Sequence, residues 1–326
     1  MRKVKWGLLS TANINRRVIP AIRASRRGAL VAVASREMSV AQAYAKKWEI
    51  PRAFGSYQNM LDSGEVDAVY ISLPNHLHAE WTIKSLRAGV NVLCEKPFTI
   101  SLQEVDAMIA TREDTGLVLA EAFMYRHHPQ TKIAGEMVQN GKLGQVSILR
   151  GVFDFAFQSR ENVRLVPEWG GGCLWDVGVY PLSFAQYIMG GPPEWVQGAQ
   201  WLGETGVDET FAGQLGYSEN RFAQFSSSFR TPFHTFVEVV GTLGRLFIDK
   251  PFVGVNEGHM TFVDQGGHSQ VIPVPEEYLY LGEVRDMNAA ILDGTSNYLS
   301  LEETRNHVKS ALALYESART GKVVYF

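Results

Sequence analysis

Apolar residues in the first third of the chain fall into short runs separated by segments with helical spacing. The runs that predict strands are 4–9, 29–34, 67–72, 90–94 and 117–120. Between them, apolar positions three or four residues apart predict helices over 14–22, 40–48, 78–88 and 101–115. Short β-branched strands that alternate with helices are typical of right-handed βαβ crossovers. This part of the chain therefore predicts a parallel sheet that is buried on both faces.

Beyond about residue 125 the pattern changes. A helix is predicted over 130–140 and a long strand over 145–157. More strand signals follow at 196–202, 212–217, 222–229, 235–240 and 245–248, with turns between several of them. Strands joined by such turns indicate a mostly antiparallel sheet. The final helix, at about 301–319, has an apolar stripe and could return to the first part of the chain.

The pattern as a whole predicts an α/β protein with two domains. A chain of 326 residues is long enough for roughly two domains of ordinary size, each with its own core. We place the first, a doubly wound parallel sheet, at 1–124, and the second, an α+β domain built on a mostly antiparallel sheet, at 125–326.

Composition and charge exclude several classes of protein. Hydrophobic residues make up 45% and charged residues 20% of the chain, which is ordinary globular usage. With 31 basic and 34 acidic residues and no basic run, we expect no binding to nucleic acid or to a membrane. Cys94 and Cys173 lie far apart, which suits a reducing compartment better than a disulfide framework or a zinc site. The apolar stretch at the start is too short for a signal peptide or a membrane span, so we expect a cytoplasmic protein.

The first strand-to-helix turn is the place where a parallel sheet of this kind binds phosphate. The turn reads Ser10-Thr11-Ala12-Asn13-Ile14-Asn15. Against the dinucleotide fingerprint GxGxxG, the glycine positions hold Ser10, Ala12 and Asn15. Small side chains at the first two positions still let backbone amides approach a pyrophosphate at the start of the helix. Taken alone, the segment is equally compatible with an ordinary tight turn.

The end of the second strand bears on the choice of cofactor. An Asp or Glu at this point would accept the ribose 2′-hydroxyl of NAD. The chain has Ser35 and Arg36 instead, and a hydroxyl beside a planar guanidinium suits the 2′-phosphate of NADP. Glu37 follows directly and keeps NAD possible. If the turn is not a cofactor site, Arg36 is simply an exposed arginine.

Two further segments carry groups that can move a proton. Lys96, in Glu95-Lys96-Pro97, follows the fourth strand, and a partly desolvated lysine there could donate or relay a proton. The alternative is a solvated charge at a strand end. In the glycine-rich run 170–181, a helix that starts near Asp176 would bring Asp176 and Tyr180 onto one face. Asp176 could equally be the helix N-cap and Tyr180 a packing residue.

Together these segments resemble the glucose-fructose oxidoreductase, inositol dehydrogenase and rhizopine catabolism family, abbreviated Gfo/Idh/MocA. The triplet Glu95-Lys96-Pro97, followed about 80 residues later by the pattern GGGxLxDxGxY, is highly specific. The pattern is most similar to the branch that holds dimeric dihydrodiol dehydrogenases, NADP-dependent xylose dehydrogenases and ketosugar reductases. The other segments that carry the resemblance are Leu73-Pro74-Asn75-His76-Leu77-His78, Glu121-Ala122-Phe123-Met124-Tyr125-Arg126 and Gly241-Thr242-Leu243-Gly244.

The resemblance implies a Rossmann domain, a C-terminal open-faced sheet, and hydride transfer between nicotinamide C4 and a carbon of a sugar, ketosugar or cyclic vicinal diol. It implies that Lys96 is the catalytic lysine, Tyr180 the acid/base and Asp176 a site residue. Many relatives have His at the position of Tyr180, so Lys96 and Tyr180 both stay open as the proton carrier. The implied cofactor-binding residues are Ser10, Thr11, Ala12, Asn13, Ile14, Ser35, Arg36, Leu73, Pro74, Asn75, His78, Glu95 and Lys96.

Several alternatives accompany this interpretation. A nucleotide-binding sensor without turnover, or a non-redox enzyme that keeps NAD bound, would share the same cleft. His76, His78, His127 and His128 have ligand-like spacings, but no Cys or carboxylate cluster accompanies them, so we expect no metal. His78 is better explained as capping or packing the helix that follows it. Trp169 and Trp175 could face a sugar or belong to the core. The substrate itself depends on loops such as 158–169.

The strands of the second domain also predict an oligomer. Neither face of the 145–157 and 222–229 strands is cleanly polar, although a monomer would more often show one plainly solvated face. A large apolar surface usually marks an interface, and a two-fold dimer is the commonest way to bury one. We therefore expect a homodimer through the C-terminal sheet. Loops or helices of the same chain could cover this face instead.

Overall fold

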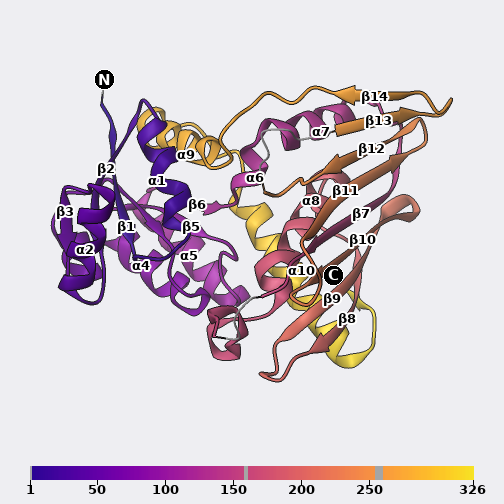
Figure 1. Ribbon diagram of the computed structural model, residues 1–326. Helices are drawn as coiled ribbons and strands as arrows, with labels where there is room; N and C mark the ends of the chain where they lie inside the picture. The colour runs from indigo at the N-terminus through magenta and orange to yellow at the C-terminus, as the bar shows by residue number, and fades with distance from the viewer. Residues whose placement is uncertain (1, 158–160, 254–259) are drawn as a thin grey trace. The chain divides into compact units, whose positions relative to one another are not determined.

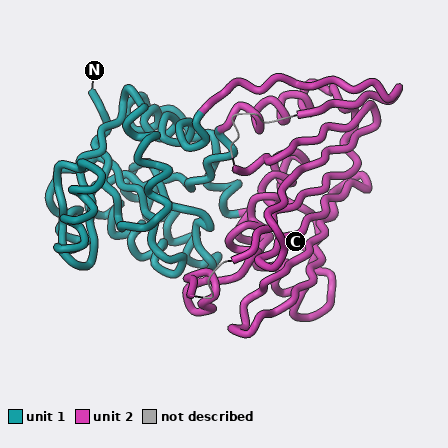
Figure 2. Tube along the Cα trace, viewed as in Figure 1, with its two compact units in different colours: residues 1–127, 278–305 teal, residues 128–277, 306–326 magenta. Residues whose placement is uncertain are grey.

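The computed structural model describes residues 2–157, 161–253 and 260–326. They form two compact units, one made of 1–127 and 278–305, the other of 128–277 and 306–326 (Figure 2). This division differs from the single boundary at 124 that we expect from the sequence, because the late segment 278–305 packs with the first unit. The last helix, α10 (Leu301–Thr320), begins in the first unit and continues in the second.

The first unit is built on a six-stranded sheet in the order β3-β2-β1-β4-β5-β6, with every neighbouring pair parallel. Its strands are β1 (Val4–Leu9), β2 (Gly28–Ala34), β3 (Arg52–Phe54), β4 (Ala68–Ile71), β5 (Asn91–Glu95) and β6 (Leu119–Ala122). This is the doubly wound order, in which the chain leaves β1 in one direction and returns to continue in the other. The predicted parallel sheet is confirmed.

Helices cover both faces of this sheet because right-handed crossovers in opposite directions fall on opposite sides. The pair α1 and α9 lies on one face and the pair α4 and α5 on the other (Figure 1). The helices of the unit are α1 (Asn15–Ala24), α2 (Met38–Trp48), α3 (Tyr57–Asp62), α4 (His78–Arg87), α5 (Leu102–Thr115), α6 (Met124–His127) and α9 (Leu281–Asp293).

Helix α9 joins the first unit through a buried polar contact as well as by packing. The indole N–H of Trp6, a fully buried residue of β1, donates to Asn288 Oδ1 at 3.0 Å. The Asn288 amide in turn donates to the hydroxyl of Ser25 at the end of α1, at 2.9 Å. The chain of hydrogen bonds therefore links β1, α9 and α1, and it explains why 278–305 belongs to this unit.

The second unit carries a nine-stranded sheet in the order β14-β13-β12-β11-β7-β10-β9-β8-β15. The pair β7 and β10 is parallel and the remaining pairs are antiparallel, which confirms the predicted mostly antiparallel sheet. The strands are β7 (Val146–Asp154), β8 (Trp195–Leu202), β9 (Asp208–Tyr217), β10 (Arg221–Ser228), β11 (His234–Gly241), β12 (Gly244–Asp249), β13 (Met260–Asp264), β14 (Ser269–Ile272) and β15 (Val324–Tyr325). The unit also contains α7 (Pro129–Gln139) and α8 (Val179–Met189).

The two faces of this sheet differ in what covers them. Helix α8 packs on β7 and β10 (Figure 1). The packing is so close that a Cβ on Gly151 would lie 2.7 Å from Pro181 Cβ. Along each strand, residues that point toward α8 alternate with residues on the opposite face, which we call the outer face. It includes Phe247, 40% exposed, and Trp201, 47% exposed. Phe236 stacks on Phe247 there with ring centroids 5.6 Å apart.

Among the helices of the described residues, none combines the length and the apolar character needed to cross a membrane.

Candidate active site

The first strand-to-helix turn is closed by side chains instead of glycines. Ser10 has φ +153°, a conformation that favours glycine, and occupies the first glycine position of the fingerprint. Its hydroxyl lies 2.7 Å from Ser72 Oγ and accepts the Ala12 N–H at 3.1 Å. Asn15, at the third glycine position, donates to Ser10 O at 2.8 Å and accepts from Ser72 Oγ at 2.7 Å. The residues that depart from the fingerprint therefore hydrogen-bond to one another.

This turn fits a bound pyrophosphate. Within the described part of the chain, no hydrogen bond from the backbone amides of Asn13 or Ile14 to a protein group is found. Thr11 and Ala12 are partly exposed beside them. Amides at the start of α1 also carry the positive end of the helix dipole, which favours an anion.

The end of β2 presents Arg36 to solvent directly after the buried Ser35. Burial raises the pKa of the Tyr57 phenol, and the positive charge of Arg36 acts on it in the opposite direction. Tyr57 packs edge-on against Trp81, with ring centroids 4.9 Å apart. Sequence reasoning missed Tyr57, because the short helix α3 that carries it gave no periodic signal. Glu37 is the extended N-cap residue of α2 and does not cap it with its side chain.

His78 ties two of the predicted cofactor-binding segments together. One ring nitrogen lies 2.8 Å from Leu73 O and the other 2.9 Å from Pro97 O. His78 therefore packs between the segment that follows β4 and the one that follows β5, and the N-cap of α4 is Leu77. Burial lowers the pKa of the imidazole, although the hydrogen bonds to these carbonyl oxygens act to raise it. A neutral ring donates to one carbonyl at a time.

The Glu95 carboxyl group organises the residues around Lys96. One oxygen accepts the Lys96 backbone N–H at 3.1 Å, and the other accepts the hydroxyl of Tyr70. Burial raises the pKa of Glu95, while the positive charge of Lys96 opposes that shift. The Lys96–Pro97 peptide bond is cis. Lys96 lies directly after β5, at the edge of the sheet where the turn after β1 and Ser35 also lie.

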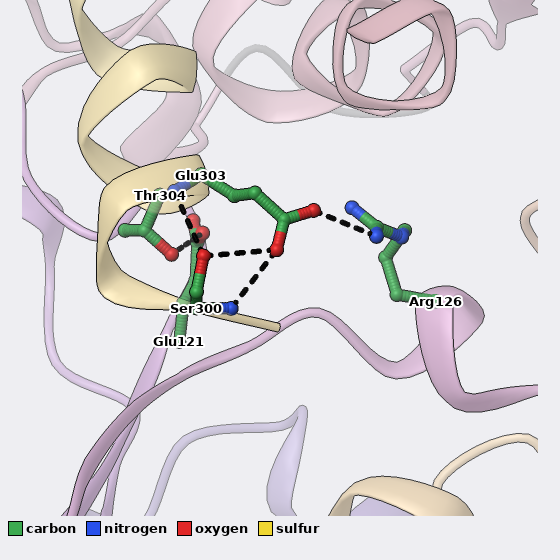
Figure 3. A network of polar contacts seen from close by, with 5 residues as sticks. All are labelled: Glu121, Arg126, Ser300, Glu303 and Thr304. Carbon is green, nitrogen blue, oxygen red and sulfur yellow. Dashed lines mark hydrogen bonds and ion pairs between the residues drawn. The ribbon is translucent and has the colours of Figure 1, made fainter. Parts of the chain in front are cut away.

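A buried network of hydrogen bonds supports the residues that follow Pro97 (Figure 3). Glu121, 4% exposed, accepts the Phe98 N–H at 3.1 Å and the Thr304 hydroxyl at 3.0 Å. Thr304 lies in the first turn of α10, so Glu121 connects the start of that helix to the residues after Pro97.

The start of α10 is itself held by a capping box. The Ser300 hydroxyl accepts the Glu303 N–H at 3.2 Å, and Glu303 Oε2 accepts the Ser300 N–H at 3.1 Å (Figure 3). The other Glu303 oxygen accepts from Arg126, a buried residue, at 3.0 Å. Burial pushes the pKa of Glu303 up, but Arg126 and Ser300 outweigh it and hold the pKa below its ordinary value. The Glu121 to Arg126 motif thus has a supporting role that the sequence did not reveal.

Glu283 is a buried carboxyl group near Glu95. It is 1% exposed, and neither of its oxygens has a hydrogen-bond partner among the described residues. Burial, followed by the charges of Glu95 and Asp286, raises the pKa of Glu283 well above its ordinary value. The folded protein therefore keeps this group neutral at a pH at which the unfolded chain has already lost the proton.

Replacing Glu283 with Gln should make stability less sensitive to pH. Because the folded pKa is raised, the wild type loses about 1.4 kcal/mol of unfolding free energy for each pH unit above the unfolded pKa, until the folded pKa is reached. Gln does not ionise and escapes this loss. Urea unfolding between about pH 5 and about pH 8 should show Glu283→Gln gaining on the wild type as pH rises. A difference that stays constant across this range would contradict the assignment of a neutral Glu283.

In the second unit, the glycine-rich run leads into a π-helical turn over Leu174–Gly178 and then into α8. Asp176 lies inside the π-helical turn, and its Oδ2 accepts from Arg164 Nε at 2.6 Å. The N-cap of α8 is Gly178, so the alternative that Asp176 caps this helix is wrong. Arg164 was missed by sequence reasoning because an arginine in an irregular loop gives no local signal.

Tyr180 is 5% exposed and packs among aromatic rings. Its ring centroid lies 5.3 Å from that of Phe153 and 5.5 Å from that of Phe252. Trp175 is buried against Tyr315 and belongs to the core, whereas Trp169 is 41% exposed.

The structure thus brings the predicted residues together in two groups. The cofactor-binding residues and Lys96 lie in the first unit, and Asp176 and Tyr180 in the second. The loop 158–169 begins with residues 158–160, which lie outside the described residues. Among the residues that are described, no group of three or more His, Cys, Asp or Glu could hold a metal ion.

Two of the histidines with ligand-like spacing make other contacts. His127 Nε2 lies 3.2 Å from Asp286 Oδ2, and His128 Nδ1 accepts the Gln130 N–H at 3.3 Å.

Comparison with known proteins defines the class. The family model described as "Oxidoreductase family, NAD-binding Rossmann fold" matches residues 4–123, and the one described as "GFO/IDH/MocA C-terminal domain" matches residues 131–247. The chain therefore belongs to the GFO/IDH/MocA family. It is an NAD(P)-dependent oxidoreductase with a Rossmann domain and a mostly antiparallel C-terminal sheet.

Individual relatives cover nearly the whole chain. D-xylose 1-dehydrogenase (NADP(+)) 2 of Haloferax volcanii is 36% identical over 98% of both chains. KijD10, a 3-ketoreductase from Actinomadura kijaniata solved with NADP and TDP-benzene, is 27% identical with a TM-score of 0.91, covering 97% of this chain and 98% of that one. Aldose-aldose oxidoreductase from Caulobacter crescentus, solved with glycerol, is 25% identical with a TM-score of 0.91 and 100% coverage of both chains.

Variants of KijD10 with a replaced lysine or a replaced tyrosine have also been solved with NADP and TDP-benzene, and both structures match this chain. The two replaced residues are 84 positions apart, the same separation as between Lys96 and Tyr180.

Proposed function

We propose that this protein is an NADP-preferring dehydrogenase or reductase that acts on a hydroxyl or carbonyl carbon of a sugar, ketosugar or cyclic vicinal diol. The observation that carries the proposal is the position of Lys96. It follows β5 at the edge of the sheet that also carries the phosphate-binding turn and Arg36. The NADP-linked xylose dehydrogenase and the NADP-bound 3-ketoreductase among the relatives support this substrate class and this cofactor.

Each group of residues has its own role in the proposed reaction. When bound, the nicotinamide accepts or gives a hydride at C4. The start of α1 holds the pyrophosphate, and Arg36 binds the 2′-phosphate. During oxidation, the substrate hydroxyl gives up its proton to the phenolate form of Tyr180 or to the neutral amine form of Lys96 as the hydride leaves its carbon. In reduction the same group returns the proton to the alkoxide.

Asp176 completes the set in the second unit. Its carboxylate is held at one oxygen by Arg164, which fixes its orientation. A fixed carboxylate accepts a hydrogen bond from a substrate hydroxyl, so we assign Asp176 to substrate binding. The spacing of the replaced lysine and tyrosine in KijD10 supports the assignment of Lys96 and Tyr180.

The test is to mix the purified protein with pentoses, hexoses and dihydrodiols and to follow the absorbance of reduced nicotinamide, with NADP and NAD in parallel. We expect turnover with at least one of these substrate classes, and faster turnover with NADP. Binding of NADP without turnover on any substrate, in either direction, would favour a sensor. Product formation without a net change in the nicotinamide would favour a non-redox enzyme with bound cofactor.

We also propose that the protein is a homodimer that pairs through the outer face of the nine-stranded sheet. The strand registers put Arg150, Glu238 and Phe247 side by side on this face. Arg150 pairs with Glu238 at 2.8 Å, beside the stacked rings of Phe236 and Phe247. Exposed apolar side chains with polar residues around them mark an interaction surface, and a two-fold dimer is the commonest way to bury one.

Light scattering coupled to size exclusion should give about twice the chain mass of 36.3 kDa at micromolar concentration. Phe247→Glu should shift the mass to that of one chain, because a charge buried against a second copy is costly. Val40→Asp, at an exposed apolar residue of α2, is the control and should leave the mass unchanged. A wild-type mass near that of a single chain would refute the dimer.

For its location we propose a reducing compartment such as the cytoplasm, supported by Cys94 and Cys173, which are both buried free thiols.

A further inference from the structure

Asp208 is a buried carboxyl group at the start of β9 that holds the segment carrying Asp176. It is 2% exposed. One oxygen accepts the Leu174 N–H at 2.7 Å and the Cys173 thiol at 3.1 Å. The other accepts the hydroxyl of Tyr315, from α10, at 2.7 Å. These donors all point at one carboxyl group.

The contact of Asp208 with the glycine-rich run is tight. Gly172 has φ +123°, and a Cβ there would lie 2.0 Å from Asp208 Oδ1. Only glycine fits both the backbone conformation and the space. The run is also fixed to the preceding loop, because Gly171 and Gly172 donate to Val166 O and Arg164 O at 3.0 and 2.9 Å. Arg164 is the residue whose side chain holds Asp176.

The thiol of Cys173 serves as a donor to Asp208. Burial, followed by the negative charge of Asp208, raises the pKa of this thiol, so it stays protonated. It lies 3.1 Å from Asp208 Oδ2 and 3.3 Å from Ser227 O.

The Leu174 N–H that Asp208 accepts is the first amide of the π-helical turn Leu174–Gly178. The turn is closed at its far end by the Val179 N–H, which donates to Leu174 O. A π-helical turn includes one residue more than a regular turn, and each residue of a helix turns the side-chain direction by about 100°. Relaxation of this turn into a regular helix would therefore rotate Asp176 relative to Tyr180.

We propose that Asp208 is a positioning residue, whose carboxylate fixes the π-helical turn and thereby the relative directions of Asp176 and Tyr180. The inference rests on the function proposed above for these two residues. Asp208 itself touches neither of them through a hydrogen bond in the described residues. It acts through the backbone of Leu174.

The test compares three variants in turnover per NADPH-binding site, which removes the contribution of unfolded protein. Asp208→Ala should lower kcat between about tenfold and a hundredfold, the cost of misplacing a reacting group by about an ångström, with the Kd for NADPH within about twofold of wild type. Asp208→Asn should recover most of kcat, because its amide oxygen can accept from Leu174 and its NH₂ can donate to Tyr315.

Ser317→Ala is the matched control. Ser317 is fully buried in the same unit, and its hydroxyl accepts a backbone N–H, that of Gly198, at 3.0 Å. This variant should lower the thermal midpoint about as much as Asp208→Ala does, while its kcat stays within about twofold of wild type.

Hydrogen exchange provides a readout that does not depend on turnover. Asp208→Ala should speed amide exchange in the peptide that spans 173–180, and Ser317→Ala should speed it in β8 instead. An unchanged kcat, or unchanged exchange in 173–180, would overturn the positioning role of Asp208. If Asp208→Ala does not fold, Asp208→Asn decides: a residual loss of kcat that is accompanied by faster exchange in 173–180 supports the proposal, and a change in only one of the two, or in neither, overturns it. If Tyr180→Phe leaves turnover normal, the role proposed for Tyr180 fails, and the exchange measurement alone decides whether Asp208 holds the turn.

Discussion

Replacing Tyr180 with phenylalanine should lower kcat for oxidation about a hundredfold or more and leave NADP binding unchanged. As the hydride leaves the substrate carbon, the hydroxyl must lose its proton. A phenol with a pKa of about 10 is a poor base at neutral pH unless a nearby cation lowers that pKa. The proposed role of Lys96 is to provide that cation.

The surroundings of Tyr180 make this substitution a clean one. The ring packs against both Phe153 and Phe252, and a phenylalanine ring fills the same space. The fold should therefore tolerate the change, and the loss of rate would reflect the hydroxyl group alone. The proposed cofactor-binding residues lie in the other unit, so we expect the Kd for NADP to stay unchanged.

A second tyrosine offers a matched control. Tyr217 is 6% exposed in the same unit, and its hydroxyl has no hydrogen-bond partner among the described residues. Tyr217→Phe should keep kcat within about twofold of wild type. If Tyr180→Phe also keeps near-normal turnover, then Lys96 or a water molecule carries the proton and Tyr180 is a packing residue.

Arg36→Ala should weaken the binding of NADP by about 1.5 to 3 kcal/mol, which is roughly a tenfold to hundredfold rise in Kd. The loss should be much smaller for NAD, because NAD lacks the 2′-phosphate that the guanidinium is proposed to bind. Arg36 is exposed at the end of β2, so its removal should leave no buried group unpaired and the fold intact.

The measurement is fluorescence titration of the wild type and the variant with both cofactors. Arg26→Ala is the control, since Arg26 is exposed at the opposite end of β2. It should change the Kd for NADP and the Kd for NAD only by the small and equal amount that the loss of one positive charge causes. Equal losses for NADP and NAD in Arg36→Ala would disprove the cofactor assignment.

The fold was largely predictable because its signals are local. Buried strands such as β4 are apolar at every position, and helices such as α5 begin and end where the sequence indicates. Elements that were missed lack such a signal. Strand β3 has 3 residues, too few for any period. Helix α9 buries Glu283 and Asn288, so polar residues interrupt the stripe that would have identified it.

The sequence predicts candidate site residues one by one, but not the contacts between them. The end of a parallel strand is a good place to look for Lys96 and Arg36. Nothing in the spacing of the sequence indicates that Arg164 holds Asp176, or that Ser10 and Asn15 replace glycines by bonding to Ser72. Such partners are brought together by strand pairing and loop packing, and a periodic pattern carries no information about either.

The first unit is made of two separate stretches of the chain, and this determines which fragments of the protein can fold. A fragment that ends at residue 127 would lack α9, and the Trp6 indole and the Ser25 hydroxyl would lose Asn288. In the intact protein His127 lies against Gly282, where an added Cβ would be 2.7 Å from His127 Cβ. A short linker from residue 127 directly to residue 278 would therefore close the unit into one continuous chain. Limited proteolysis at a single site inside the second unit should leave both pieces of the first unit associated.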